Sequence, residues 1–186
     1  MRPWRGGDGR RARLPLPHLV RCFVGSLRPG GPGPADESWA VAHLTEAEAG
    51  LWRRMSGADR RHGLAVARRV RSALGRQRYV DRPVIAAALL HDVGKVEAGL
   101  GTAGRVVATV FIVARGRERV EAWTVRPGRL RRVGRYARHP ALGAVLLAGA
   151  GSDPLTVAWA AEHHLPPGRW TIEPDLAGAL RAADSL

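Results

Sequence analysis

Apolar residues along most of the chain recur with the spacing of a helix rather than with the alternation of a strand. From about residue 36 onward they return every three or four positions, as on the buried face of an amphipathic helix. Thr45 and Glu48 form a capping-box pattern, and Ser56 is placed to cap a helix that continues to about Leu74. Proline in a first turn marks three further helix starts, at Pro83, Pro154 and Pro174. The pattern predicts an all-α fold.

One segment in the middle of the chain carries the opposite signal. β-Branched pairs within residues 106–113 favour a strand, and residues 115–117 offer a turn into a second strand over 119–125. The alternative is a helix over residues 102–114. We favour the helix, partly because of the family resemblance described below.

A continuous apolar run, residues 84–90, ends directly in His91 and Asp92. Such a run predicts a buried helix, which we expect to end at Gly94. An imidazole and a carboxylate buried there without partners would be costly. A bound cation removes that cost, and this pair of ligand types suits Mn, Fe, Zn, Co or Ni. The sequence therefore points to a metal site at the end of this helix.

The residue after Gly94 is unusual for this chain. Lys95 is the single lysine among 30 basic residues. Lysine carries a compact point charge, whereas arginine presents a planar fork. We interpret Lys95 as a contact for a phosphate oxygen; the alternative is one lysine codon that has persisted in an arginine-biased gene.

Residues 91–95, His-Asp-Val-Gly-Lys, resemble the signature of the HD-domain metal-dependent phosphohydrolases. That family is all-α, so the resemblance implies an HD-like helical bundle, and its ligands follow the order H…HD…D. It implies that His62, which lies 29 residues before His91, is the first ligand. It also implies that Asp184, which lies 92 residues after Asp92, is the last. The resemblance covers about residues 45–186.

Two more elements resemble the two-metal branch of that family. Residues 139–143 match its His-Pro-x-x-Gly element, and residues 162–164 match its double histidine. The resemblance implies that His139 and His163 hold a second ion, while His164 binds a substrate phosphate or another metal. Taken singly, His139 would be read as a capping residue before proline. His62 alone would equally be read as a packed histidine.

Two departures from the family narrow the expected activity. Residues 165–170 read Leu-Pro-Pro-Gly-Arg-Trp and lack the Gly-Tyr-Pro element of the cyclic-dinucleotide phosphodiesterases. Members with three metals are similar but add a carboxylate one turn before the first histidine. Here that position is Ala58, and Asp59 is one step away. We therefore expect at most two ions and predict no specificity for cyclic di-GMP.

The resemblance implies a phosphohydrolase that attacks a nucleotide or phosphodiester with metal-activated water. Asp92 would bridge the ions, and Lys95 would neutralise charge developing on phosphate oxygens. Arg169, or the pair Arg131 and Arg132, would bind a substrate phosphate. Two other classes remain open: a non-catalytic metal or nucleotide sensor, and an RNA-associated protein that uses the HD fold as a scaffold.

Charge and composition add to this interpretation without changing the predicted site. The 186 residues carry a net charge of +14, which predicts either non-specific nucleic-acid contact or a solvated basic surface. Residues 1–35, rich in Gly, Pro and Arg, predict a disordered basic arm before a domain at 36–186. Cys22 is the single cysteine, which excludes an intramolecular disulfide. The longest apolar runs are about half of the roughly 18 to 20 residues that a membrane span needs. We expect a cytoplasmic location.

Overall fold

The computed structural model describes residues 30–75 and 81–185, and all regular structure within them is helical. The all-α prediction is confirmed for these residues. The arm predicted over residues 1–35 falls mostly outside them. Helix α2 begins at Pro34, two residues before the expected start of the domain at 36.

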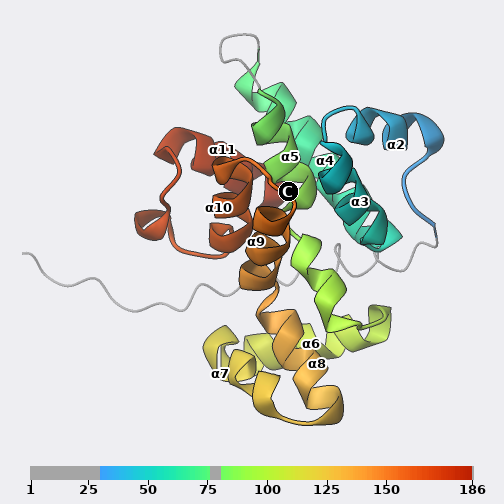
Figure 1. The fold of residues 1–186 in the computed structure, drawn as a ribbon. Helices are drawn as coiled ribbons and strands as arrows, with labels where there is room; N and C mark the ends of the chain where they lie inside the picture. The colour runs from blue at the N-terminus through green and yellow to red at the C-terminus, as the bar shows by residue number, and fades with distance from the viewer. Residues whose placement is uncertain (1–29, 76–80, 186) are drawn as a thin grey trace, which may run out of the picture.

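Most helices form one bundle around a shared apolar core (Figure 1). α5 lies at its centre, and each of residues 84–90 is buried. Its neighbours are α4 and α10, and α9 packs in turn on α10. The bundle contains α2 (Pro34–Val41), α3 (Glu46–Arg54), α4 (Gly57–Leu74), α5 (Arg82–Leu90), α9 (His139–Gly149), α10 (Pro154–Glu162) and α11 (Pro174–Ser185).

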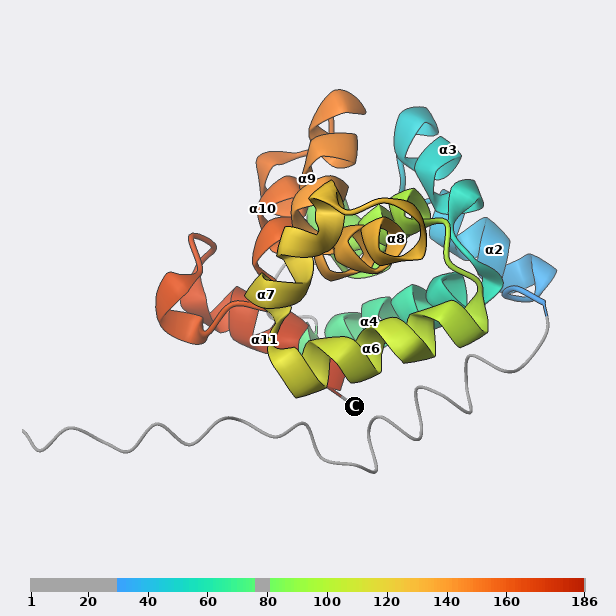
Figure 2. The ribbon, with the colours of Figure 1, turned by 90° about the horizontal axis from the view of Figure 1, so that it is seen from below.

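A second, smaller apolar core holds together a lobe that faces the reader in Figure 2. Its helices are α6 (Thr102–Arg115), α7 (Arg117–Glu121), η2 (Ala122–Val125) and α8 (Gly128–Ala137). The preference for a helix over residues 102–114 is confirmed, and no hairpin forms. Ala108 of α6 and Val120 of α7 are both fully buried in this core. Gly116, with φ +85°, makes the sharp break between the two helices.

The predicted helix starts are accurate at single-residue level. The Thr45 hydroxyl accepts the Glu48 amide at 3.2 Å, and the Glu48 carboxylate accepts the Thr45 amide at 2.8 Å. Ser56 accepts the amide of Asp59 at 3.2 Å and so caps α4. Pro83, Pro154 and Pro174 each lie in a first turn.

The predicted end of the central helix at Gly94 is wrong. α5 ends at Leu90, and the short helix η1 (Val93–Ala98) follows. The backbone tightens after Asp92, whose carbonyl accepts the Lys95 amide at 3.0 Å. This break lets two adjacent side chains, His91 and Asp92, face the same centre, which a continuous helix would prevent.

Among the described residues, no single helix is long and apolar enough to cross a bilayer. The segments Arg82–Ala98 and Thr102–Arg115 pass that test together, but they are bent by 98°.

Candidate metal centre

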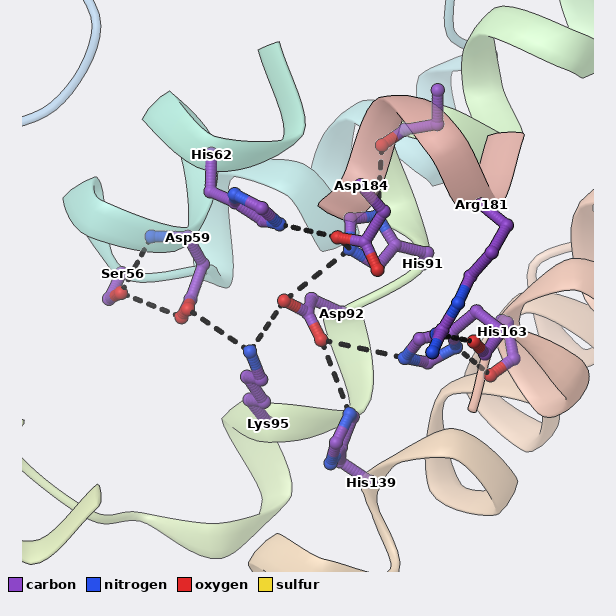
Figure 3. A network of polar contacts seen from close by, with 12 residues as sticks. Ser56, Asp59, His62, His91, Asp92, Lys95, His139, His163, Arg181 and Asp184 are labelled. Carbon is purple, nitrogen blue, oxygen red and sulfur yellow. Dashed lines mark hydrogen bonds and ion pairs between the residues drawn. The ribbon is translucent and has the colours of Figure 1, made fainter. Parts of the chain in front are cut away.

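The ends of several helices bring six histidine and aspartate side chains to one buried point (Figure 3). They are separated by up to 122 positions in the sequence, and six different helices or helix ends supply them. They comprise His62 on α4, His91 after α5, Asp92 before η1, His139 at the start of α9, His163 after α10 and Asp184 on α11. All six residues that the sequence singled out as metal ligands therefore lie together.

Three of the histidines share one orientation. In each, Nδ1 lies within 3.0 Å of the backbone carbonyl three residues earlier. An Nδ1–H that donates to this carbonyl leaves Nε2 as a free acceptor aimed at the centre. A backbone partner of this kind is what orients metal-binding histidines in proteins. The three are His91, His139 and His163.

Asp92 lies between the histidines. Its Oδ1 is 3.2 Å from Nε2 of His139 and 3.8 Å from Nε2 of His163. Its Oδ2 is 3.5 Å from Nε2 of His91. One carboxylate thus faces histidines on two sides.

Asp184 closes the other side of the centre. Its Oδ1 is 2.9 Å from Nε2 of His62 and 3.4 Å from Nε2 of His91. The Arg181 guanidinium, one turn earlier on α11, donates to the carbonyl of His163. The last helix therefore supplies one carboxylate and also fixes the backbone of another site residue.

Among the described residues, two buried imidazole nitrogens at this centre have no hydrogen bond: Nε2 of His139 and Nε2 of His163. A buried polar atom without a partner costs about 1–3 kcal/mol. A cation beside both atoms would satisfy them. Two clusters have ligand atoms within 4.8 Å of one another and could hold a metal ion: His62 with His91 and Asp92, and His139 with His163 and His164. The residues present therefore fit a metal site.

The electrostatics of the centre are those of tightly coupled charges. Burial lowers the pKa of His91, but Asp92 and Asp184 overcome this effect and raise it to about 9. Burial disfavours the charged form of Asp92, yet Lys95 and His91 hold its pKa well below the usual range. Burial lowers the pKa of His163, and the neighbouring histidines lower it further. The carboxylates are thus ionised and His163 is neutral, which are the states that bind metal. His91, whose pKa is raised, would have to release a proton to bind one.

Lys95, the single lysine, reaches the edge of this centre from η1. Its Nζ is 2.5 Å from Oδ2 of Asp92 and 4.0 Å from Oδ1 of Asp59. Burial opposes its charge, but Asp92 raises its pKa. The side chain is therefore a charged ammonium held next to the ligands.

Sequence reasoning set Asp59 aside, but the structure places it behind Lys95. Its carboxylate is buried, accepts the Ser56 hydroxyl at 2.6 Å and forms an ion pair with Arg105 of α6. The i, i+3 spacing between Asp59 and His62 on one helix face was the available signal. Arg105 carried no such local signal, because α6 brings it to α4 only in the folded chain.

The residues predicted to bind substrate differ in their positions. His164 is exposed, and its ring lies 4.1 Å from that of His163 and 5.2 Å from that of His139. Arg169 is exposed in η3 (Pro167–Arg169), and among the described residues it contacts none of the six candidate ligands. Arg132 donates instead to the carbonyl of Gly99. Of the predicted substrate residues, His164 and Lys95 flank the centre.

Two glycines allow the helices that carry the candidate ligands to approach each other closely. A Cβ on Gly94 would lie 2.0 Å from the carbonyl oxygen of His139 and 2.5 Å from the amide nitrogen of Gly143. A Cβ on Gly63 would lie 2.4 Å from the carbonyl oxygen of Leu89. The first contact presses η1 against α9, and the second presses α4 against α5. Each joins two helices that carry candidate ligands.

No protein-family model matches this chain, and no curated protein and no solved structure is significantly similar to it.

Proposed function

We propose that this protein is an HD-type, metal-dependent phosphohydrolase that holds two divalent transition-metal ions and acts on a nucleotide or phosphodiester. The observation that carries the proposal is the position of Asp92. Its Oδ1 faces His139 and His163, and its Oδ2 faces His91. Nε2 of both His139 and His163 is buried without a hydrogen bond. This donor set matches a pair of ions that share one carboxylate.

The side chains divide into two ligand sets around that carboxylate. The first consists of His62, His91 and Asp184, in which Oδ1 of Asp184 lies 2.9 Å from Nε2 of His62 and 3.4 Å from Nε2 of His91. His139 and His163 form the second. Imidazole nitrogen with carboxylate oxygen favours Mn, Fe, Co, Ni or Zn over Mg or Ca. When bound, such ions supply Lewis acidity toward phosphoryl oxygens and activate water.

The protein's own groups supply the remaining chemistry. Asp92, ionised because Lys95 and His91 surround it, holds the two ligand sets together. Lys95 presents a fixed positive charge at the rim, where it would stabilise negative charge on phosphoryl oxygens. The second carboxylate near Lys95, Asp59, keeps the ammonium at this rim when Asp92 is engaged by metal. His164 offers an exposed imidazole on the other side.

The proposal is tested by measuring metal content and turnover together. We expect about two equivalents of transition metal by mass spectrometry. We also expect hydrolysis of bis(p-nitrophenyl) phosphate or p-nitrophenyl phosphate that chelator abolishes and Mn²⁺ restores. His139→Gln should leave about one equivalent and lower turnover at least about a hundredfold. The control is His43→Gln, since His43 contacts the carbonyl and the ring of Trp39, outside the centre.

Each contrary result points to a different conclusion. If the protein binds its full metal content but hydrolyses neither these esters nor a panel of nucleotides, the result would favour a metal- or nucleotide-sensing module over an enzyme. A protein that takes up no transition metal would leave an HD-like scaffold, and RNA binding that His139→Gln does not alter would then favour the RNA-associated alternative. Equal metal loss in His43→Gln would show that the assay reports unfolding rather than ligation.

Replacing Lys95 should separate catalysis from metal binding. Lys95→Met is expected to lower kcat about 10²–10³-fold, the usual cost of removing one charged stabiliser of the transition state. Metal content should stay at the wild-type level, because Lys95 is not in either ligand set. Lys95→Arg, which keeps the charge but changes its shape, should lose less. Equal loss of metal and kcat in Lys95→Met would contradict the role proposed for the ammonium.

A further inference from the structure

The chain from η2 to the end of α9 is rich in arginine and contains no acidic residue. Residues 122–152 contain six arginines and no carboxylate. Within them, each of residues 125–131, Val-Arg-Pro-Gly-Arg-Leu-Arg, is exposed. In Figure 1 this segment, here called the basic tip, lies at the bottom of the smaller lobe, away from the bundle that carries the metal centre. Apart from Arg131, which the sequence offered with Arg132 as one alternative contact for a substrate phosphate, the proposed catalytic chemistry does not use it.

The basic tip is held firmly from behind. A Cβ on Gly134 would lie 2.5 Å from the amide nitrogen of Thr124, so α8 packs directly on the backbone of η2. The Trp123 ring meets Phe111 of α6 edge to face, with centroids 5.1 Å apart. Arg115 lies over both rings at 5.5 Å. The segment is therefore presented by packed helices.

The exposed side chains of the basic tip are of two kinds. Val125 is 87% exposed and Leu130 is 43% exposed, so the basic tip also presents aliphatic surface. The side chains of Arg126, Arg129 and Arg131 have no hydrogen bond or ion pair within the described part of the chain. Three unpaired cations thus lie in the same seven residues as two exposed aliphatic side chains.

We propose that the basic tip docks on the surface of a bilayer that contains anionic phospholipids. Guanidinium groups pair with lipid phosphates, and each contributes to adsorption near a negative surface. Aliphatic side chains between such cations enter the boundary between headgroups and acyl chains. Single-stranded nucleic acid would satisfy the arginines, but it is normally held by stacking on aromatic rings. Residues 125–131 contain no aromatic residue, so the lipid surface explains both kinds of side chain.

The proposal is tested with the full-length chain and vesicles of phosphatidylcholine with or without phosphatidylglycerol. We expect co-sedimentation with the anionic vesicles only. Arg126→Gln with Arg129→Gln and Arg131→Gln should weaken partitioning about a hundredfold. Control replacements remove the same charge from the bundle: Arg53→Gln, Arg68→Gln and Arg71→Gln. These should weaken partitioning much less, because the remaining basic tip still docks.

The aliphatic residues provide the test that separates lipid from other polyanions. Val125→Ser with Leu130→Ser should weaken vesicle binding about tenfold or more and leave binding of a single-stranded RNA unchanged. In a Cys22→Ser background, an environment-sensitive dye on Val125→Cys should brighten and shift to the blue with anionic vesicles. The same dye on Val145→Cys of α9, a position that is 70% exposed, should not respond.

Three outcomes would overturn the proposal. The first is equal binding to neutral and anionic vesicles. The second is an equal loss of binding in the basic-tip arginine variant and in its bundle control, which would show only non-specific attraction to the whole basic chain. The third is unchanged vesicle binding in Val125→Ser with Leu130→Ser while RNA binding depends on the tip arginines, which would assign the surface to nucleic acid.

Discussion

Asp92→Asn is expected to remove both metal ions at once. Oδ1 of this carboxylate faces His139 and His163, and Oδ2 faces His91. Asparagine keeps the shape but loses the charge and offers one acceptor oxygen in place of two. Metal content should fall below about a tenth of the wild-type value, and hydrolysis should fall at least about a thousandfold, because the two ions of the proposed centre would act on the same phosphoryl group.

The same substitution should also destabilise the metal-free protein, which gives the experiment an internal control. Lys95 is only 17% exposed and relies on Asp92 for its counter-charge. Removing one partner of such a buried pair costs about 3–5 kcal/mol. Asp92→Asn combined with Lys95→Met removes both charges, so urea unfolding should show most of this free energy recovered. Metal binding should not return in the double variant.

Replacing Glu97, a nearby carboxylate, is the control that distinguishes loss of a metal ligand from loss of any negative charge. Glu97 lies on η1, as Lys95 does, but it pairs with Arg54 at the surface, at 3.1 Å. Glu97→Gln should change the free energy of unfolding by less than about 1 kcal/mol and leave metal content unchanged. Full metal occupancy in Asp92→Asn, or recovery of metal in the double variant, would contradict the bridging role.

Much of the fold was predictable because its signals are local. A capping box needs only Thr45 and Glu48, and a proline in a first turn needs only its own ring and the missing amide hydrogen. These features marked helix starts that the structure reproduces. The segment 102–114 was harder, since its β-branched residues favour a strand. Burial of one face of α6 against α7 and α8 overrides that preference.

The candidate ligands were predictable for a different reason. Histidine beside aspartate at the end of a fully apolar run is costly unless something compensates it, and the resemblance to a known family supplied the distant partners. The structure brings His62 and Asp184, which are 122 positions apart, within 2.9 Å of each other. Motif order indicated this contact, whereas periodicity alone could not.

What escaped prediction depends on contacts between elements. The end of α5 at Leu90 follows from a tight turn that no single residue announces. Arg105 reaches Asp59 only because α6 crosses the start of α4. Arg169 stood near the double histidine in sequence, but η3 leaves it exposed and away from the ligands. Because the chain has 30 basic residues, the presence of an arginine near a motif does not indicate that it lies at the site.

Two glycines in the motifs that resemble the HD-domain family also make a close backbone contact with each other. Gly94 belongs to the His-Asp-Val-Gly-Lys segment and Gly143 to the His-Pro-x-x-Gly segment. A Cβ on Gly143 would lie 3.1 Å from the amide nitrogen of Gly94, so the two backbones touch. The contact sets the separation between Asp92 and His139, which carry ligand atoms on the two sides of the centre.

Gly94→Ala is therefore expected to be among the most damaging single substitutions in the chain. The added Cβ would lie 2.0 Å from the backbone oxygen of His139, and backbone at the start of α9 cannot yield as a flexible side chain can. Forcing η1 and α9 apart should cost about 3–5 kcal/mol in urea unfolding. In protein that still folds, the ion held by His139 and His163 should be lost before the other.

Gly50→Ala is the matched control, because it adds the same methyl group to a helix position where nothing lies within 4 Å. Gly50 is exposed within α3, so alanine there should stabilise the protein by about 0.5–1 kcal/mol through helix propensity. The two variants should thus change the free energy of unfolding in opposite directions. If Gly94→Ala matched Gly50→Ala in stability and kept full metal content, the close contact between η1 and α9 could not be what positions the two halves of the centre.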